Sequence, residues 1–152
     1  MKTNLRPAIV SAVLGLWLIT LSGCAAPTVE LQKAVLTQLS LQSLEVGLDL
    51  DIFNPNQYAV PLETVDWNLT LFDAPFTQGQ TEFSRSLPAG KSASVRVPLD
   101  IQFSALALGV DHLLGGRSIP WHIEGGCTFR TPAGPIRIAF DGGGSWKNPL
   151  RK

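Results

Sequence analysis

The stretch LDLDIFNPNQYAVPLETVDWNLTLF, residues 48–72, contains two runs of alternating apolar and polar side chains, joined by turn-forming residues. Alternation with a period of two places each set of side chains on its own face of a β-strand. The segment Asn54-Pro55-Asn56 ends the first run, because proline pushes the preceding residue towards extended geometry and asparagine favours turns. We therefore predict two half-buried strands joined at this turn. When the first run is extended back to Ser43, its apolar face comprises Leu44, Val46, Leu48, Leu50 and Ile52.

The same period recurs along the rest of the chain. It predicts further strands over residues 78–87, 94–103, 119–130 and 135–146. The polar character of residues 78–87 indicates an edge strand. Pro98 cannot donate to a ladder and so indicates an edge or a bulge.

One segment departs from the strand pattern. Residues 104–116 have apolar side chains at helical spacing, with Ser104 as a candidate N-cap and Gly115-Gly116 as a stop signal. The predicted fold is mainly β, an antiparallel fibronectin- or immunoglobulin-like sandwich of six or seven strands with one short helix.

The first 23 residues are typical of a secretory targeting segment. Lys2 and Arg6 precede a 13-residue run, residues 9–21, in which only Ser11 and Thr20 are polar. As a helix this run would span roughly 20 Å, less than the ~30 Å hydrocarbon core of a bilayer. A cleaved signal peptide is therefore favoured over a permanent transmembrane helix.

The end of this segment, Leu21-Ser22-Gly23-Cys24, resembles the lipobox of bacterial lipoproteins. The resemblance implies cleavage after Gly23, a diacylglycerol group on the Cys24 thiol and an acyl chain on the new amino terminus. Several acyl chains give stable membrane attachment, and no other cofactor is expected. Residue 25 is Ala rather than Asp, which resembles the sorting pattern of outer-membrane lipoproteins facing the periplasm. Residues 24–30 then form the acylated cysteine and a short tether, and residues 31–148 the domain.

Across the domain the chain resembles the late-embryogenesis-abundant type 2 family, also called the water stress and hypersensitive response (WHy) domain. The resemblance is carried by the strand that runs into Asn54-Pro55-Asn56, by Pro61-Leu62, by Gly79 and by LPAGKSASVRVPLDI, residues 87–101. It implies a fibronectin-like sandwich and a role in desiccation or other stress. No catalytic residues come with the family, and its Asn-Pro-Asn signature implies a turn.

Charge argues against nucleic acid as a partner. The whole chain is formally neutral, and without Lys2 and Arg6 it has 10 basic against 12 acidic residues. The basic residues are scattered, whereas nucleic-acid binding requires a basic stripe.

Few residues suggest a catalytic or metal-binding site. Glu45, Asp49 and Asp51 share one strand face, which is either solvated or part of a cation site. His122 and Glu124 share another outward face, but a general acid–base pair also requires a cleft and a tuned pKa. We therefore predict neither an enzyme nor a metal site.

Three other features have structural explanations. His112 lies on the predicted helix, far from His122 in sequence, so the two histidines do not suggest a zinc site. Ser145 follows a glycine run, residues 142–144, which indicates a bulge or a close strand approach rather than a nucleophile. Cys127 shares a face with apolar residues, so a core thiol is favoured over a reactive one.

Two functions remain open. The first is a membrane-anchored, non-enzymatic protein that protects neighbouring proteins or the membrane during drying or envelope stress. The second is a periplasmic interaction module that binds a protein partner or lipid. Client proteins are thus candidate partners, and the sequence does not reveal the oligomeric state.

Overall fold

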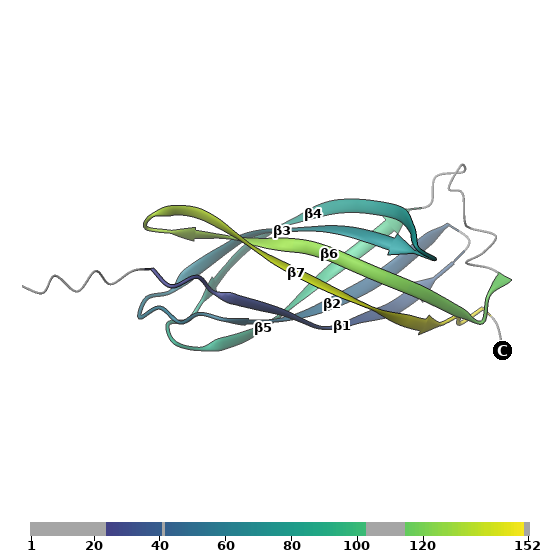
Figure 1. Ribbon diagram of the computed structural model, residues 1–152, viewed down its shortest axis with the longest axis horizontal. Coiled ribbons are helices and arrows are strands. Elements are labelled where there is room, and N and C mark those ends of the chain that lie inside the picture. The colour runs from purple at the N-terminus through teal and green to yellow at the C-terminus, as the bar shows by residue number, and fades with distance from the viewer. Residues whose placement is uncertain (1–23, 41, 103–114, 151–152) are drawn as a thin grey trace, which may run out of the picture.

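The computed structural model describes residues 24–40, 42–102 and 115–150, and these contain seven strands (Figure 1). The strands are β1 (Thr28–Leu39), β2 (Ser43–Phe53), β3 (Val60–Leu71), β4 (Ala74–Leu87), β5 (Ser92–Gln102), β6 (Ser118–Thr131) and β7 (Gly134–Lys147). The predicted helix falls within residues 103–114, together with His112, and so lies outside the described residues.

The strands form two antiparallel sheets packed as a sandwich. One sheet has the order β1-β2-β5 and the other the order β4-β3-β6-β7. In Figure 1 the strands run close to the long axis, and the chain enters at one end beside the β2–β3, β4–β5 and β6–β7 connections. We call this end the Cys24 end. The predicted class, a mainly β antiparallel sandwich, is confirmed.

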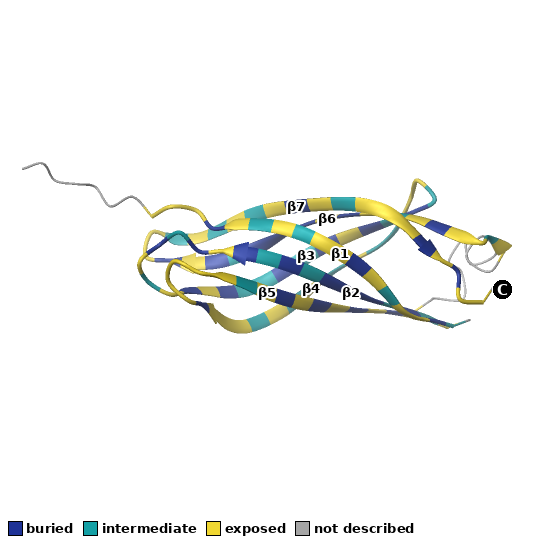
Figure 2. Ribbon diagram, turned by 90° about the horizontal axis from the view of Figure 1, so that it is seen from below, coloured by how far each residue is buried: buried dark blue, intermediate teal, exposed yellow. Residues whose placement is uncertain are grey.

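The core follows the alternation of the sequence. All five apolar residues predicted for the inner face of β2 are at most 2% exposed. The second alternating run, in β3, likewise has its apolar residues buried: Val65, Trp67, Leu69 and Leu71. Figure 2 shows this alternation as bands along the strands. Fully burying a large aliphatic side chain stabilises a fold by about 1.5–3 kcal/mol, so the alternation is the main determinant of the sandwich.

The sheet edges also agree with the sequence. Both β4 and β5 are edge strands, and Pro98 pairs in register with Gly47 of β2, so β5 is an edge without a bulge. Because β5 pairs with β2 alone among the described strands, it is a strand position in which proline is tolerated.

One strand was not predicted. β1 begins at Thr28, inside the segment expected to be a tether, which shortens that tether to residues 24–27. Its pairing with β2 shifts register between Leu31 and Lys33 and again between Leu36 and Gln38. Each shift breaks the period of two, so TVELQKAVLTQL does not show the alternation expected of a strand.

Two tryptophans close the sandwich on one side. The indole Nε1 of Trp146 in β7 donates to the Ala34 carbonyl of β1 at 2.8 Å, which joins the edges of the two sheets. Trp121 stacks on Trp146 with ring centroids 5.2 Å apart. The β1–β7 side of the sandwich is therefore fixed by a buried hydrogen bond between sheets as well as by apolar contacts.

Candidate functional site

The Asn-Pro-Asn signature forms a buried polar network at the Cys24 end. Asn54 is fully buried, and its Nδ2 donates to the carbonyls of Tyr58, Leu87 and Pro88 at 2.8–3.2 Å. Its Oδ1 accepts from the backbone N–H and the side-chain Nδ2 of Asn56, both at 3.1 Å. The segment begins the connection between β2 and β3, as its composition predicts, and its asparagines also tie the β2–β3 and β4–β5 connections together.

The second asparagine holds the chain that enters the domain. Asn56 Oδ1 accepts from the Ala25 N–H at 3.0 Å, and Asn56 Nδ2 donates to the Ala25 carbonyl at 2.8 Å. One side-chain amide thus satisfies both backbone groups of Ala25, as a neighbouring strand would. Asn56 is itself 7% exposed, and its carbonyl accepts from the Gly90 N–H at 2.9 Å.

Cys24 lies directly beside this network. Its thiol is exposed, and the Tyr58 hydroxyl donates to Cys24 Sγ at 2.9 Å. This hydrogen bond raises the pKa of Tyr58 above its ordinary value of 10.0. The other lipobox residues, Leu21, Ser22 and Gly23, lie outside the described residues. The predicted attachment residue is therefore accessible and close to the family signature.

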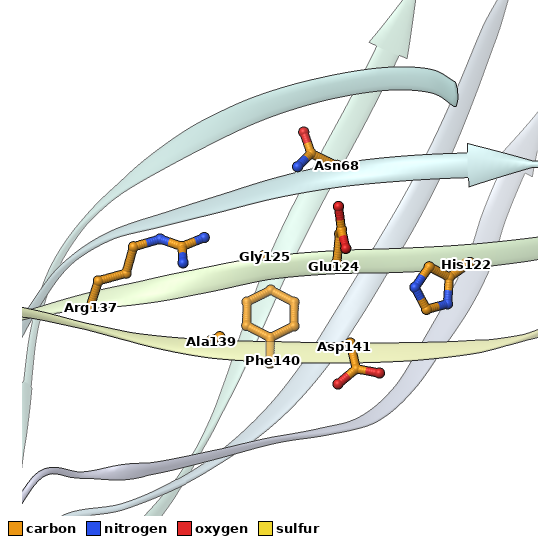
Figure 3. Close-up of a pocket in the computed structure, with 8 residues that line it drawn as sticks. All are labelled: Asn68, His122, Glu124, Gly125, Arg137, Ala139, Phe140 and Asp141. Atoms are coloured by element: carbon orange, nitrogen blue, oxygen red, sulfur yellow. The ribbon is translucent and has the colours of Figure 1, made fainter. Parts of the chain in front are cut away.

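A separate depression of about 500 Å³ lies on the outer face of the β4-β3-β6-β7 sheet (Figure 3). It brings His122 and Glu124 of β6 together with Asn68 and Asp141. Glu124 faces both Asn68 and Asp141 in register, so two carboxylates stand on adjacent strands. Like charges in directly opposed positions destabilise a sheet slightly. Sequence analysis did not identify Asn68 and Asp141 as neighbours of Glu124, because the register between strands that are distant in sequence cannot be read from the sequence.

Asp49 is not an open cation ligand. Arg96 binds its carboxylate through two nitrogens, at 2.6 and 2.8 Å, and Lys33 lies 3.4 Å away. The Arg96 hydrogen bonds hold the pKa of Asp49 below its usual value of 3.8. No group of three or more His, Cys, Asp or Glu side chains in the described ranges is arranged to hold a metal ion.

Asp66 and Arg137 form a similar pair across the larger sheet. Arg137 Nε donates to Asp66 Oδ2 at 2.9 Å, its Nη2 binds the other oxygen, and its guanidinium lies over Gly126. This hydrogen bonding lowers the pKa of Asp66 from its usual value of 3.8. The bidentate geometry makes it one of the stronger surface ion pairs.

We expect Asp66→Asn to lower the free energy of unfolding by about 0.5–1 kcal/mol at pH 7, the range for a partly exposed pair. A carboxylate whose pKa falls on folding stabilises the protein above its unfolded pKa, near 3.8. That stabilisation is lost as the pH falls further, so wild type and variant should converge at low pH. Urea unfolding at pH 7 and pH 3 measures this.

Asp141→Asn is the matched control, because Asp141 faces Glu124 and its neutralisation removes a repulsion. We expect it to leave stability unchanged or slightly higher at pH 7. Equal losses for both variants would contradict a specific Asp66–Arg137 contribution.

Cys127 is a core residue. It is fully buried in β6, and burial, with a smaller contribution from Asp66, raises the pKa of Cys127 to about 12. Within the described residues both cysteines are free of disulfides.

Native protein carrying Cys24→Ala should therefore react with an aromatic disulfide reagent at pH 8 at least about a hundredfold more slowly than the unfolded chain, since only the thiolate reacts. The readout is absorbance of the released thiolate, and the unfolded protein is the control. Rapid reaction of the native protein would show that Cys127 is accessible.

The glycine run of β7 is explained by side chains that lie over it. A Cβ at Gly142 would come 2.7 Å from Leu31 Cδ2, and one at Gly144 would come 3.0 Å from the Trp121 ring. The β6–β7 register has no shift, so β7 contains no bulge at these glycines. Of the two predicted explanations, the close approach of neighbouring residues is the correct one. Ser145 pairs with Ser118 through a hydroxyl contact at this edge.

In the part of the chain that the structure describes, no helix has the length and apolar character needed to cross a bilayer. The described domain is built from the seven strands alone.

Solved structures share this fold. A protein from Arabidopsis thaliana, solved in solution, superposes with a TM-score of 0.69 at 19% identity, covering 88% of this chain and 89% of that one. A protein described as late embryogenesis abundant gives 0.68 at 18% identity, covering 82% and 72%. A protein from Archaeoglobus fulgidus gives 0.60 at 12% identity, covering 81% and 97%. These similarities show the fold.

Among curated protein sequences, none matches this chain. The family comparison is positive: the family described as "Late embryogenesis abundant protein" matches residues 49–144, more than half of the chain. The matched range includes the Asn54-Pro55-Asn56 network, and the fold agrees with that of a protein described in the same terms. This chain therefore belongs to the late embryogenesis abundant (LEA_2) family.

Proposed function

We propose that this protein is a membrane-anchored, non-enzymatic stress protein of the late embryogenesis abundant type. The observation that carries the proposal is the position of Cys24: it ends a lipobox-like sequence, is exposed, and lies four residues before the first strand of a family sandwich. Acylation there would attach the domain to the cell envelope, with the outer membrane facing the periplasm as the favoured location.

The proposed mechanism is protection by the surface of a stable domain. A sandwich held at the membrane would separate neighbouring proteins during water loss and so limit their aggregation. The outer faces of β4 and β5 support this role, since alternate residues of these strands are exposed and most of them are polar. The partners of such a protein are the membrane and unfolding clients, and no catalytic residue or cofactor is required.

The test combines a drying assay with an anchor variant. A labile enzyme is dried with the mature domain or with an inert protein of equal mass, and we expect higher recovered activity with the domain. In cells, a deletion strain is compared under drying, salt and envelope stress with a strain carrying Cys24→Ala. We expect the variant to leave the membrane fraction and to behave like the deletion. If the dried enzyme recovers no more activity with the domain than with the inert protein, the protective mechanism is contradicted.

A second function, a binding module, is supported by a hollow of about 420 Å³ between the edge strands β1 and β7. Its lining includes Ala34, Val35 and Leu36 of β1 and the largely buried Trp146, with Lys33 and Lys147 among its polar residues, and this apolar part could hold an apolar segment of a partner. Crosslinking in cells separates the two functions, because a binding module yields one recurrent partner and a general protectant yields many.

A further inference from the structure

The chain between the attachment cysteine and the sandwich is short and is not free. Only Ala25, Ala26 and Pro27 separate Cys24 from β1, and three extended residues reach at most ~11 Å. Ala25 is bound through both backbone groups by the Asn56 side chain, and Pro27 is buried. A lipid on Cys24 would therefore be joined to a fixed point of the domain rather than to a flexible linker.

That fixed point is part of a rigid network. Asn56 is held by Asn54, which is fully buried and bonded to carbonyls of two connections. Asn54 N–H also donates to the Lys91 carbonyl at 3.1 Å, and Gly90 N–H donates to the Asn56 carbonyl at 2.9 Å. Hydrogen bonds thus join the β2–β3 connection to the β4–β5 connection and to Ala25, next to Cys24.

The surface at this end suits the headgroup layer of a membrane. Its three connections, residues 54–59, 88–91 and 132–133, contain no Asp or Glu, and their one charged residue is Lys91. Tyr58, the only tyrosine of the chain, places its hydroxyl 2.9 Å from Cys24 Sγ, where the glyceryl group would begin. Phe53 is 41% exposed at the end of β2. Amphipathic aromatic residues and a lysine are favoured at membrane–water interfaces.

We infer that the Asn56 side chain is a clasp, meaning that its two hydrogen bonds to Ala25 fix the acylated N-terminus to the domain. This attachment places the Cys24 end against the headgroup layer of the membrane that carries the Cys24 lipid. The strands run along the long axis from this end (Figure 1), so the sandwich stands on the membrane in one orientation. The β3–β4 turn at Phe72 and Asp73, at the other end, is held away from the bilayer by a strand of 12 residues, roughly 40 Å. The inference rests on the proposed anchoring and adds an orientation to it.

The test uses the full acylated protein in phosphatidylcholine vesicles that contain a lipid with a nitroxide on its headgroup. A single fluorophore is attached through Ala89→Cys, at the Cys24 end, or Ala74→Cys, at the start of β4; both positions are exposed. Buried Cys127 and acylated Cys24 do not compete for the label. We expect quenching at position 89 to exceed that at position 74 several-fold.

Two variants then uncouple the lipid from the domain. Asn56→Ala deletes both hydrogen bonds to Ala25. A flexible Gly/Ser insertion between Cys24 and Ala25 frees the lipidated Cys24 from Tyr58 while it keeps the Asn56–Ala25 hydrogen bonds and the rest of the domain. We expect both to bring quenching at position 89 down towards that at position 74, with unchanged membrane association. The insertion variant, which leaves the folded domain intact, keeps the test valid if Asn56→Ala unfolds.

The outcomes are distinct. Equal quenching at the two positions in the otherwise unaltered protein overturns the orientation. Strong quenching at position 89 that survives Asn56→Ala or the insertion overturns the clasp. Failure of the acylated chain to float with vesicles removes the proposed anchoring, and the inference with it, whereas flotation with equal quenching removes the inference alone.

Discussion

Replacing Asn54 with alanine should lower the free energy of unfolding by about 3 kcal/mol, and the melting temperature by roughly 10 °C. The substitution removes five hydrogen bonds made by a fully buried side chain, three as donor and two as acceptor. It also leaves Asn56 without the partner that orients its amide. The loss is large because buried polar groups that lose their partners keep the penalty of desolvation.

Asn68→Ala is the control for this change. Asn68 is an exposed residue of β3 whose replacement should shift stability by no more than about 0.5 kcal/mol. Thermal and urea unfolding of both variants measure the difference. Similar small effects would mean that the Asn-Pro-Asn network contributes only the turn that its sequence predicts.

Gly125→Ala should destabilise the fold by about 3 kcal/mol or more, at the upper end of the range for overpacked sites. A Cβ at this position would come 2.1 Å from the Asp66 carbonyl oxygen and 2.8 Å from Phe140 Cζ. The first contact is with backbone of the neighbouring strand, which cannot move without breaking the β3–β6 ladder. Circular dichroism during thermal unfolding gives the measurement.

Gly47→Ala is the matched control, since it also lies within a strand. Its Cβ would meet nothing nearer than Arg96 Cδ at 3.7 Å, an ordinary contact. We expect neutral or slightly higher stability, because alanine has less freedom than glycine in the unfolded chain. A Gly125 variant as stable as the Gly47 variant would show that β3 and β6 have room to separate.

Local patterns were enough to predict the inner faces of the strands. On β2, alternate residues from Leu44 to Ile52 are apolar and all are buried, because the pleat of a strand sends successive side chains to opposite faces. The same reasoning assigned Cys127 to the core and Pro98 to an edge. These predictions succeeded because each depends only on residues adjacent in sequence.

The missed features depend on register and distance along the chain. β1 was hidden by two register shifts that break its alternation. The β3–β4 turn has positive φ at both Phe72 and Asp73, 51° and 61°, without the Asn-Gly or Asp-Gly pair that usually marks such a turn. Asp141 joins His122 and Glu124 only because β6 and β7 pair in one particular register.

The Asn-Pro-Asn segment combines a local feature that the sequence predicts with contacts that only the tertiary structure creates. Its composition alone predicts a turn, since proline restricts its neighbour and asparagine bonds to nearby backbone. That Asn56 binds Ala25, 31 residues earlier, depends on two sheets bringing the N-terminus and the β2–β3 connection to the same end. Side-chain periodicity is a local property and can be read from the chain, whereas hydrogen bonds between distant segments exist only after the sheets have paired and packed.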